Sequence, residues 1–280
     1  MIHKNKRERA LDRLVFLFLL VCLLVHLLPL AMVVLGSLKT YSEVMTDVLS
    51  LPEHFSLNNY VQVFVQMDYP HAFLNTLLVT VIGVAGIVVL GSTAGYKLSR
   101  TNTRFSYITF LLCIMPMMIP FQSFMITLVK ISKKMHLINS LWGLSVIYWG
   151  LGAPMAIFLY HGFTRGIPKE LEECALLDGC SPWRIFTRIV FPLLQPVTAS
   201  VIVVNAMWLW NDFLLPLLII GTSKSTKTLQ LAAYAFMGQY KMEWQNIIAA
   251  AMLSIIPALI IYLIFQKNIV KGLVAGAIKG

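Results

Sequence analysis

Residues 165–196 read RGIPKELEECALLDGCSPWRIFTRIVFPLLQP, the longest polar stretch of a chain that is otherwise strongly apolar. Two short helices are predicted within it. Pro168 suits the first position of one helix, where no amide hydrogen bond is lost, and Gly179 is placed to end that helix in a left-handed turn. Ser181 suits an N-cap, with Pro182 opening the second helix. A helix–glycine–helix segment between apolar stretches has the character of a docking surface.

The charges of this segment are divided between its two predicted helices. Arg184 and Arg188 lie on the second helix, and Pro192 and Pro196 are expected to break it before the chain becomes apolar again. Carboxylates in the first turns of the first helix favour the positive end of its dipole; they are Glu170, Glu172 and Glu173. An ordinary amphipathic loop of a membrane protein would look similar, so that alternative stays open.

The composition places the chain in a membrane. Of its 280 residues 58% are hydrophobic and 12% are charged, and the mean hydropathy is +0.78. A soluble domain carries roughly 25% charged residues. The net charge of +10 would suggest nucleic acid as a partner of a soluble protein, but here the basic residues cluster beside apolar stretches. Such clusters set topology and meet anionic lipid headgroups, so membrane lipid, and no nucleic acid, is the expected partner.

Catalytic, cofactor-binding and metal sites are not expected in this chain. Its four cysteines form no CxxC pair and have no histidine at metal spacing, which leaves neither a disulfide framework nor a zinc site. The sequence also lacks the GxxxxGK[ST], HExxH and GxSxG patterns. If the protein moves a solute with ATP, the ATPase must therefore be another subunit.

Six apolar stretches are long enough for membrane helices. They are expected at about residues 14–38, 72–98, 105–129, 141–163, 197–221 and 246–265. The first is long for a signal-peptide core and lacks a clean cleavage site, so we expect it to be retained. Pro116 and Pro120 should break the third, and broken backbone at membrane depth lines a cavity or packs on protein. The predicted fold is an all-α membrane bundle.

The basic residues support a topology with both termini in the cytoplasm. In that arrangement 15 of the 22 Lys and Arg residues lie on the inner side. Five of these are in the N-terminal arm, three follow the second stretch, four are in residues 165–196 and three are at the C-terminal end. Lys130, Lys133 and Lys134 fall outside, against the rule locally, and residues 39–70 form an external loop.

Small and polar residues within the stretches have packing interpretations. Gly91 and Gly95 form a GxxxG pair, which favours close helix packing. His26 lies one turn from Pro29, and we expect it to hydrogen-bond a freed carbonyl rather than to act in transport.

A polar group in the fifth stretch is the other candidate site. It consists of Asn205, Trp208, Asn211 and Asp212, and Asp212 is the only carboxylate within an apolar stretch. An ionised carboxylate is costly to bury unless it is paired or hydrated. Asp212 is therefore either near the outer interface, where it is hydrated or capped by Asn211, or part of a translocation path; the sequence leaves both open.

The polar segment resembles the EAA loop of ABC importer permeases. The matching residues are Glu173, Cys174, Ala175, Gly179, Ile189, Pro192 and Pro196. Cys174 stands where that family has its first Ala, and Phe191 stands where it has Leu. In the family this loop is the coupling helix, which sits in a cleft of a separate ATPase subunit.

Three further segments resemble the MalG-type permeases of carbohydrate importers. They are residues 75–78 (NTLL), 210–216 (WNDFLLP) and 270–280 (VKGLVAGAIKG). The resemblance, which runs from about residue 70 to the C-terminus, implies a type I (MetI-like) six-helix permease bundle. It also implies a MalF-type second permease, an ABC ATPase dimer that holds ATP and Mg, and an extracytoplasmic sugar-binding protein.

The resemblance also implies roles for individual residues of a single permease domain, residues 1–280, with a core bundle at about 70–268. The coupling loop, residues 165–196, would meet the ATPase through Glu172, Glu173, Cys174, Ala175, Leu177, Asp178, Gly179 and Pro182. The cytoplasmic tail, residues 267–280, would reach between the ATPase subunits through Gly276, Ala277, Lys279 and Gly280.

The expected function is that of a permease subunit of an ATP-driven importer of a sugar or oligosaccharide, in the cell membrane of a prokaryote. It would form half of the translocation pathway. The alternative is an ion-coupled secondary transporter. Such a transporter needs ionisable groups within the membrane and broken helices in both repeats, and Asp212 is the one feature that supports it. The sequence does not specify the sugar.

Overall fold

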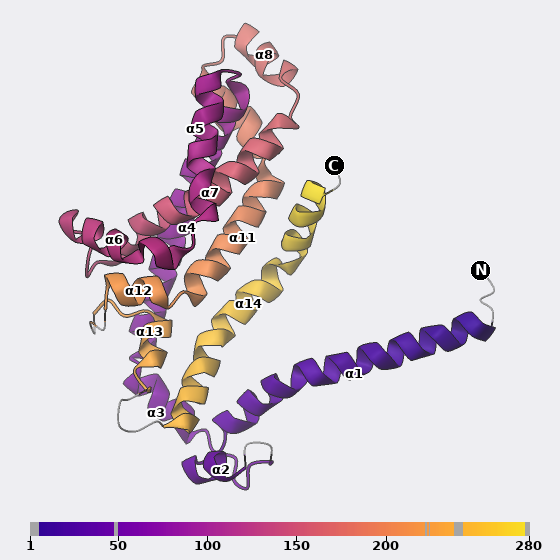
Figure 1. Ribbon diagram of the computed structural model, residues 1–280, viewed down its shortest axis with the longest axis vertical. Coiled ribbons are helices and arrows are strands. Elements are labelled where there is room, and N and C mark those ends of the chain that lie inside the picture. The colour runs from indigo at the N-terminus through magenta and orange to yellow at the C-terminus, as the bar shows by residue number, and fades with distance from the viewer. Residues whose placement is uncertain (1–5, 48–49, 222, 224, 238–242, 278–280) are drawn as a thin grey trace. The chain divides into compact units, whose positions relative to one another are not determined.

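The computed structural model describes residues 6–47, 50–221, 223, 225–237 and 243–277, and the side chains among residues 11–263 of these (Figure 1). The elements are helical, as predicted. In chain order they are α1 Lys6–Ser37, α2 Tyr41–Thr46, α3 Asn58–Gln66, α4 Tyr69–Arg100, α5 Arg104–Ile114, the 3-10 helix η1 Met115–Met118, α6 Phe121–Lys134, α7 Leu141–Arg165, α8 Glu170–Leu177, α9 Pro182–Ile185, the π-helix η2 Phe186–Val190, α10 Phe191–Leu193, α11 Gln195–Asn211, α12 Leu214–Ile219, α13 Leu229–Tyr234 and α14 Trp244–Ala277.

Four helices are individually long and apolar enough to cross a membrane: Leu11–Ser37 within α1, Tyr69–Arg100, Leu141–Arg165, and Trp244–Leu263 within α14. Two further pairs qualify only if a sharp bend is allowed within the span. α5 with η1 meets α6 at 106°, and Pro182–Leu193 meets α11 at 76°. Counting each bent pair as one span gives six, the predicted number.

The chain divides into two compact units. The first contains residues 1–69 and 233–255, and the second contains residues 70–232 and 256–280. In the first unit, the segment expected to be a loop, residues 39–70, instead forms α2 and α3. Asn59 holds it to the end of α1 by donating its amide to the backbone carbonyls of Ser37 (3.0 Å) and Lys39 (2.8 Å).

Two contacts in the first unit refine this picture. The carboxylate of Glu43 accepts hydrogen bonds from the backbone and side chain of Thr40, and the backbone bond is the main reason why the pKa of Glu43 falls to about 2. His26 bonds a carbonyl, as expected, through Nδ1 at 2.7 Å. The acceptor is the carbonyl of Cys22, whereas Pro29 frees that of Val25, so the predicted link to the proline is wrong.

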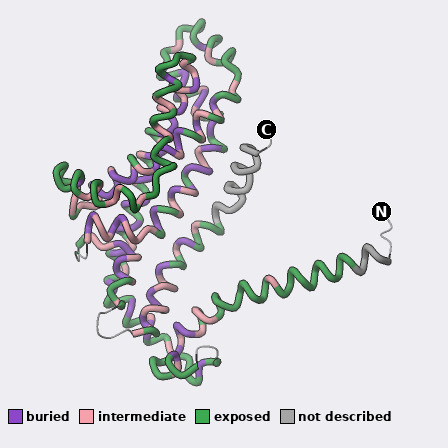
Figure 2. The backbone as a smooth tube through the Cα atoms, in the orientation of Figure 1, coloured by how far each residue is buried: buried purple, intermediate pink, exposed green. Residues whose placement is uncertain are grey.

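The second unit is held together where α4 meets α7, with further buried side chains from α11 (Figure 2). A Cβ built on Gly91 would lie 2.4 Å from the Cβ of Ala156, and one on Gly95 would lie 2.7 Å from the Cβ of Tyr160. The GxxxG pair therefore packs closely against α7, as predicted.

The prolines of the third span break it, as predicted, and the break is a large change of direction. Pro116 lies in η1 and Pro120 precedes α6, so neither position supplies a backbone N–H to continue the helix. The lysines predicted to lie outside, which include Lys133 and Lys134, occupy the last part of α6 rather than a straight continuation of α5.

The break expected at Pro192 is absent. The helix passes through this residue by widening into the π-helix η2, in which the Phe191 N–H bonds the carbonyl of Phe186, five residues back. Pro192 cannot donate, so the widened turn accommodates the missing bond. The chain bends instead after Leu193, and Pro196 lies in the first turn of α11.

The helix of the fifth span ends earlier than predicted, and the helix of the sixth continues beyond the predicted span. The helix expected at residues 197–221 stops at Asn211, because Asp212 is extended and its Oδ1 accepts a hydrogen bond from the Leu214 backbone N–H (3.1 Å). α14 continues to Ala277, so the described part of the predicted tail is helical.

The close approach at Gly95 generates a test with a matched control. A Cβ on Gly95 would also lie 2.9 Å from the His161 backbone nitrogen, so Gly95→Ala should destabilise the fold by about 1–3 kcal/mol. Gly162→Ala, on α7, meets nothing within 4 Å and should be neutral or stabilising. The measurement is the temperature at which half of the purified protein leaves its monodisperse peak. Equal temperatures for both variants would contradict the packing.

Candidate functional site

The coupling loop begins with α8, two residues later than predicted. Lys169 is the N-cap, its carbonyl accepts the backbone N–H groups of Glu172 and Glu173, and Pro168 lies just before it. The three carboxylates nevertheless occupy the first turn, as predicted. Pro168 therefore limits where the helix can begin without being part of it.

The turn after α8 has the predicted left-handed conformation. Gly179 has a φ of +78°, and the Cys180 backbone N–H donates to the carbonyl of Ala175 at 3.0 Å. This six-residue closure is the Schellman motif, which satisfies a carbonyl at the helix end. A Cβ at Gly179 would meet nothing within 4 Å, so only the backbone conformation selects glycine there.

The second half of the loop starts as predicted and is anchored by its apolar side. Ser181 is the N-cap position and Pro182 the first residue of α9, although the Ser181 side chain makes no capping bond. Ile185 and Phe186 are buried in the core together with Ala175 of α8. The loop is thus a folded part of the second unit.

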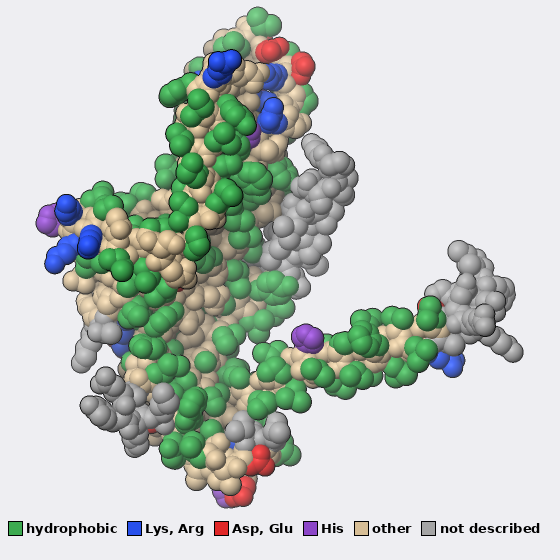
Figure 3. Space-filling view, in the orientation of Figure 1, with side chains coloured by type: hydrophobic (Ala, Val, Ile, Leu, Met, Phe, Trp, Pro, Cys, Tyr) green, Lys and Arg blue, Asp and Glu red, His purple; other side chains and the backbone are tan. Residues whose placement is uncertain are grey.

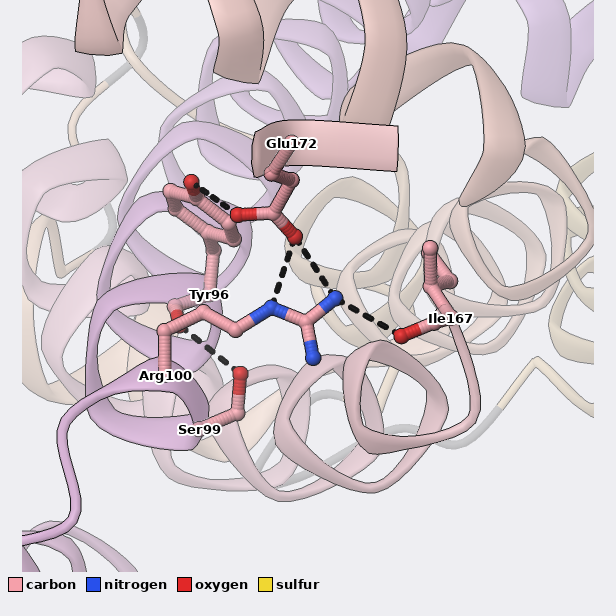
Figure 4. A network of polar contacts seen from close by, with 5 residues as sticks. All are labelled: Tyr96, Ser99, Arg100, Ile167 and Glu172. Carbon is pink, nitrogen blue, oxygen red and sulfur yellow. Dashed lines mark hydrogen bonds and ion pairs between the residues drawn. The ribbon is translucent and has the colours of Figure 1, made fainter. Parts of the chain in front are cut away.

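A polar network ties the beginning of α8 to the last turn of α4 (Figure 4). The Glu172 carboxylate accepts from the Arg100 guanidinium, with Oε1 2.7 Å from Nε and 2.6 Å from Nη2, and its Oε2 accepts from the Tyr96 hydroxyl at 2.7 Å. Arg100 Nη2 also donates to the carbonyl of Ile167 at 2.9 Å. The two charged side chains are only 12% and 14% exposed, so this charge-assisted contact is largely shielded from water.

This network divides the predicted ATPase-contacting residues into two groups. Glu172 and the buried Ala175 point into the chain. The exposed group comprises Glu173, Cys174, Leu177, Asp178, Gly179 and Pro182. Leu177 is 88% exposed, an apolar side chain standing free at the tip of α8. Tyr96 and Arg100 were missed by the sequence reasoning, because nothing in their spacing links them to a glutamate more than seventy residues away.

The predicted tail residues are described only in part. Gly276 and Ala277 form the end of α14. Lys279 and Gly280 lie outside the described residues.

A cavity of about 350 Å³ lies in the second unit, beside the break between α5 and α6. Its lining includes Phe121, Gln122, Phe124, Gly150, Trp208 and Asp212. The Oδ2 of Asp212 accepts a hydrogen bond from the buried Tyr148 hydroxyl at 2.8 Å. The broken third span was expected either to line a cavity or to pack on protein, and Pro116 is among the residues that line this cavity.

Two of the four residues that the sequence singled out in the fifth stretch, Trp208 and Asp212, line this cavity. Asn205 is buried and donates to the Val201 carbonyl (2.8 Å), while Asn211 donates to the Met207 carbonyl (2.8 Å). Neither asparagine is among the lining residues, and the predicted capping of Asp212 by Asn211 is wrong. Over the described residues, no cluster of three or more His, Cys, Asp or Glu side chains could hold a metal.

Residues 87–274 match the family described as "Binding-protein-dependent transport system inner membrane component". The chain belongs to this family. The match covers the bent spans, the coupling loop and the cavity. It establishes a multi-pass membrane protein that is the inner-membrane component of a transport system, with no ATPase domain of its own.

Similar proteins cover nearly the whole chain. It is 39% identical over 251 residues to the probable starch degradation products transport system permease protein AmyC of Thermoanaerobacterium thermosulfurigenes, which covers 90% of this chain and 91% of that protein. It is 30% identical over 269 residues to the melibiose/raffinose/stachyose import permease protein MelC of Bacillus subtilis, with 96% and 97% covered.

Among solved structures, a bacterial ABC transporter involved in the import of the acidic polysaccharide alginate aligns with a TM-score of 0.80 at 19% identity, covering 95% of this chain and 99% of that chain. A second, an alginate ABC transporter in complex with alginate pentasaccharide-bound periplasmic protein, aligns with a TM-score of 0.64 at 15% identity, covering 94% of each chain. At these identities the likeness shows a shared fold.

The Glu172–Arg100 contact can be tested by a double-mutant cycle in the assembled transporter. Glu172→Gln and Arg100→Gln should each lower thermal stability, and the double variant should be no worse than either, with a coupling energy of about 1–3 kcal/mol. Glu170→Gln removes an exposed carboxylate from the same turn and serves as the control. Additive losses in the double variant would show that the pair does not act as a unit.

Proposed function

We propose that this chain is the permease subunit of an ATP-driven importer that receives a sugar or oligosaccharide from an extracytoplasmic binding protein. The observation that carries the proposal is the folded coupling loop, which exposes one face of α8 and fastens the other to α4 through Glu172 and Arg100. Similar proteins named for starch products and raffinose-type sugars support the substrate class.

The exposed face of α8 suits docking on a separate ATPase. Glu173 and Asp178 provide negative charge for basic residues of that partner, and Leu177 provides an apolar contact at the tip. ATP and Mg would be held by the ATPase dimer, and the C-terminal residues would reach between its subunits. Both termini would then be cytoplasmic, as the distribution of Lys and Arg predicts.

Movement of the docked loop would reach the membrane through two contacts. The ion pair of Glu172 with Arg100 pulls on the last turn of α4, and Phe186 lies against the Tyr96 ring with centroids 5.1 Å apart. α4 packs closely against α7 at Gly91 and Gly95, where there is no room for a side chain. A displacement of α4 would therefore also move α7. α7 carries Tyr148, which bonds Asp212 at the cavity.

The cavity is the part of this chain that would form its half of the translocation path, with a MalF-type permease supplying the other half. Trp208, which is 40% exposed, offers an aromatic surface, and Gln122 and Asp212 offer polar atoms for sugar hydroxyl groups. The Tyr148 hydroxyl leaves Asp212 free to accept further hydrogen bonds, since a carboxylate has about four acceptor positions.

The bend at Gly179 gives the sharpest test of coupling. Gly179→Val should strain the left-handed turn by about 1–2 kcal/mol and uncouple ATP hydrolysis from sugar uptake, without preventing membrane insertion. Gly179→Asn is the matched control, because asparagine tolerates this conformation and the space around it is open. The measurement is sugar taken up per ATP hydrolysed in proteoliposomes. Normal coupling in the valine variant would refute the lever role of the loop.

Asp212 separates an ATP-driven importer from an ion-coupled transporter. Asp212→Asn removes the charge and keeps the shape: its oxygen can still accept from the Leu214 N–H, and its NH2 group can donate to the Tyr148 hydroxyl oxygen. ATP-dependent uptake should therefore persist within about tenfold. Uptake of radiolabelled maltodextrin is measured in proteoliposomes of the complex, with ATP on the ATPase side and the proton gradient collapsed by an ionophore. If the ionophore abolishes wild-type uptake and the variant is inactive as well, the protein is ion-coupled.

A further inference from the structure

A second pocket, separate from the cavity at Asp212, lies where the ends of α4, α5 and α7 meet. Its volume is about 370 Å³, and its lining includes Ser99, Thr101, Asn102, Arg104, His161 and Arg165. All of these residues belong to the second unit. None of the features assigned above uses this pocket.

The pocket carries positive charge without a balancing carboxylate. Arg104 and Arg165 line it, and no Asp or Glu is among the lining residues that the structure describes. Glu172 lies at this end of α4, but its carboxylate is already paired with Arg100. Over the described part of the chain, no ion pair involves either lining arginine. Two guanidinium groups facing one pocket favour an anion with several acceptor oxygens.

Three of the hydroxyl groups that line the pocket are already used as donors. Those of Ser99, Thr101 and Ser106 donate to the backbone carbonyls of Tyr96, Lys97 and Leu98, respectively. The His161 ring is stacked on Phe110, with centroids 4.0 Å apart. The donors left for a ligand include the two guanidinium groups, the Asn102 amide, the His161 ring N–H and the hydroxyl groups of Thr103 and Tyr107. Only the guanidinium groups among these are permanently charged, so they are the main source of anion binding.

The pocket opens beside an apolar helix face. On α5, Tyr107 lines the pocket and is 64% exposed, and Leu111, one turn further along the same side of the helix, is 41% exposed. Figure 3 shows Lys and Arg side chains gathered at the end of the second unit that carries α8, and hydrophobic side chains along α5 below them. A ligand that suits both features has an anionic head and a hydrocarbon chain.

We propose that this pocket binds the headgroup phosphate of an anionic phospholipid, whose acyl chains lie along α5. The pocket lies at the same helix ends as the coupling loop, so under the proposed function the lipid belongs to the cytoplasmic leaflet. Basic pockets between membrane helices on that side suit such headgroups. A lipid bound there lies against the α4 end that holds Glu172 through Arg100.

The experiment measures lipid retention by the assembled transporter with native mass spectrometry. Phosphatidylglycerol and phosphatidylcholine of identical acyl composition are titrated into the detergent-solubilised complex. Phosphatidylglycerol should be retained at one molecule per copy of this chain more tightly than phosphatidylcholine. The double variant Arg104→Gln/Arg165→Gln should weaken its binding about tenfold to thirtyfold, because each basic residue contributes about 1 kcal/mol near an anionic headgroup.

The matched control is Lys133→Gln/Lys134→Gln, which removes the same charge from α6, outside the pocket. It should leave phosphatidylglycerol binding unchanged. Equal loss in both double variants, or equal retention of the two lipids by the wild type, would overturn the proposal. Displacement of the lipid by millimolar inorganic phosphate would assign the pocket to a soluble anion instead. None of these outcomes depends on sugar uptake, so they are distinct from a failure of the proposed function.

Discussion

The ion pair between Glu172 and Arg100 is the contact on which the arrangement of the coupling loop depends. It joins α8 to the last turn of the long apolar helix α4, and the Tyr96 hydroxyl and the Ile167 carbonyl complete it. Both charged groups are mostly shielded from water, so leaving either without its partner would be costly. This constraint keeps one face of α8 against the bundle and leaves the opposite face, with Leu177, free for a partner.

Breaks in the helices produce the other functional features. Pro116 and Pro120 turn the third span through 106°, and Asp212 ends α11 by accepting from the backbone of Leu214. The two breaks meet at the cavity that contains Trp208 and Asp212. A straight six-helix bundle would have no such space, because close-packed helices fill it with side chains. The same residues that interrupt the helices therefore create the cavity.

The cavity at the helix breaks and the pocket beside the coupling loop carry opposite charges. Among the lining residues that the structure describes, the cavity at the bends has one charged side chain, the carboxylate of Asp212, whereas the pocket beside the coupling loop has the guanidinium groups of Arg104 and Arg165. A neutral, hydroxyl-rich solute suits the first, and an anionic lipid headgroup suits the second. Between them, α4 and α7 pack without space at Gly91 and Gly95, so both regions share one rigid pair of helices.

The sequence by itself determined the all-helical membrane fold, the six apolar stretches, the break at Pro116 and Pro120, and the left-handed turn at Gly179. Each of these follows from local chemistry: apolar length, the missing N–H of proline, and the freedom of glycine at positive φ. Tertiary structure alone decided that Glu172 points inward, that Asp212 pairs with Tyr148, and that the helix passes through Pro192. These outcomes depend on which side chains from distant parts of the chain come within hydrogen-bonding distance, and residue spacing carries no information about that.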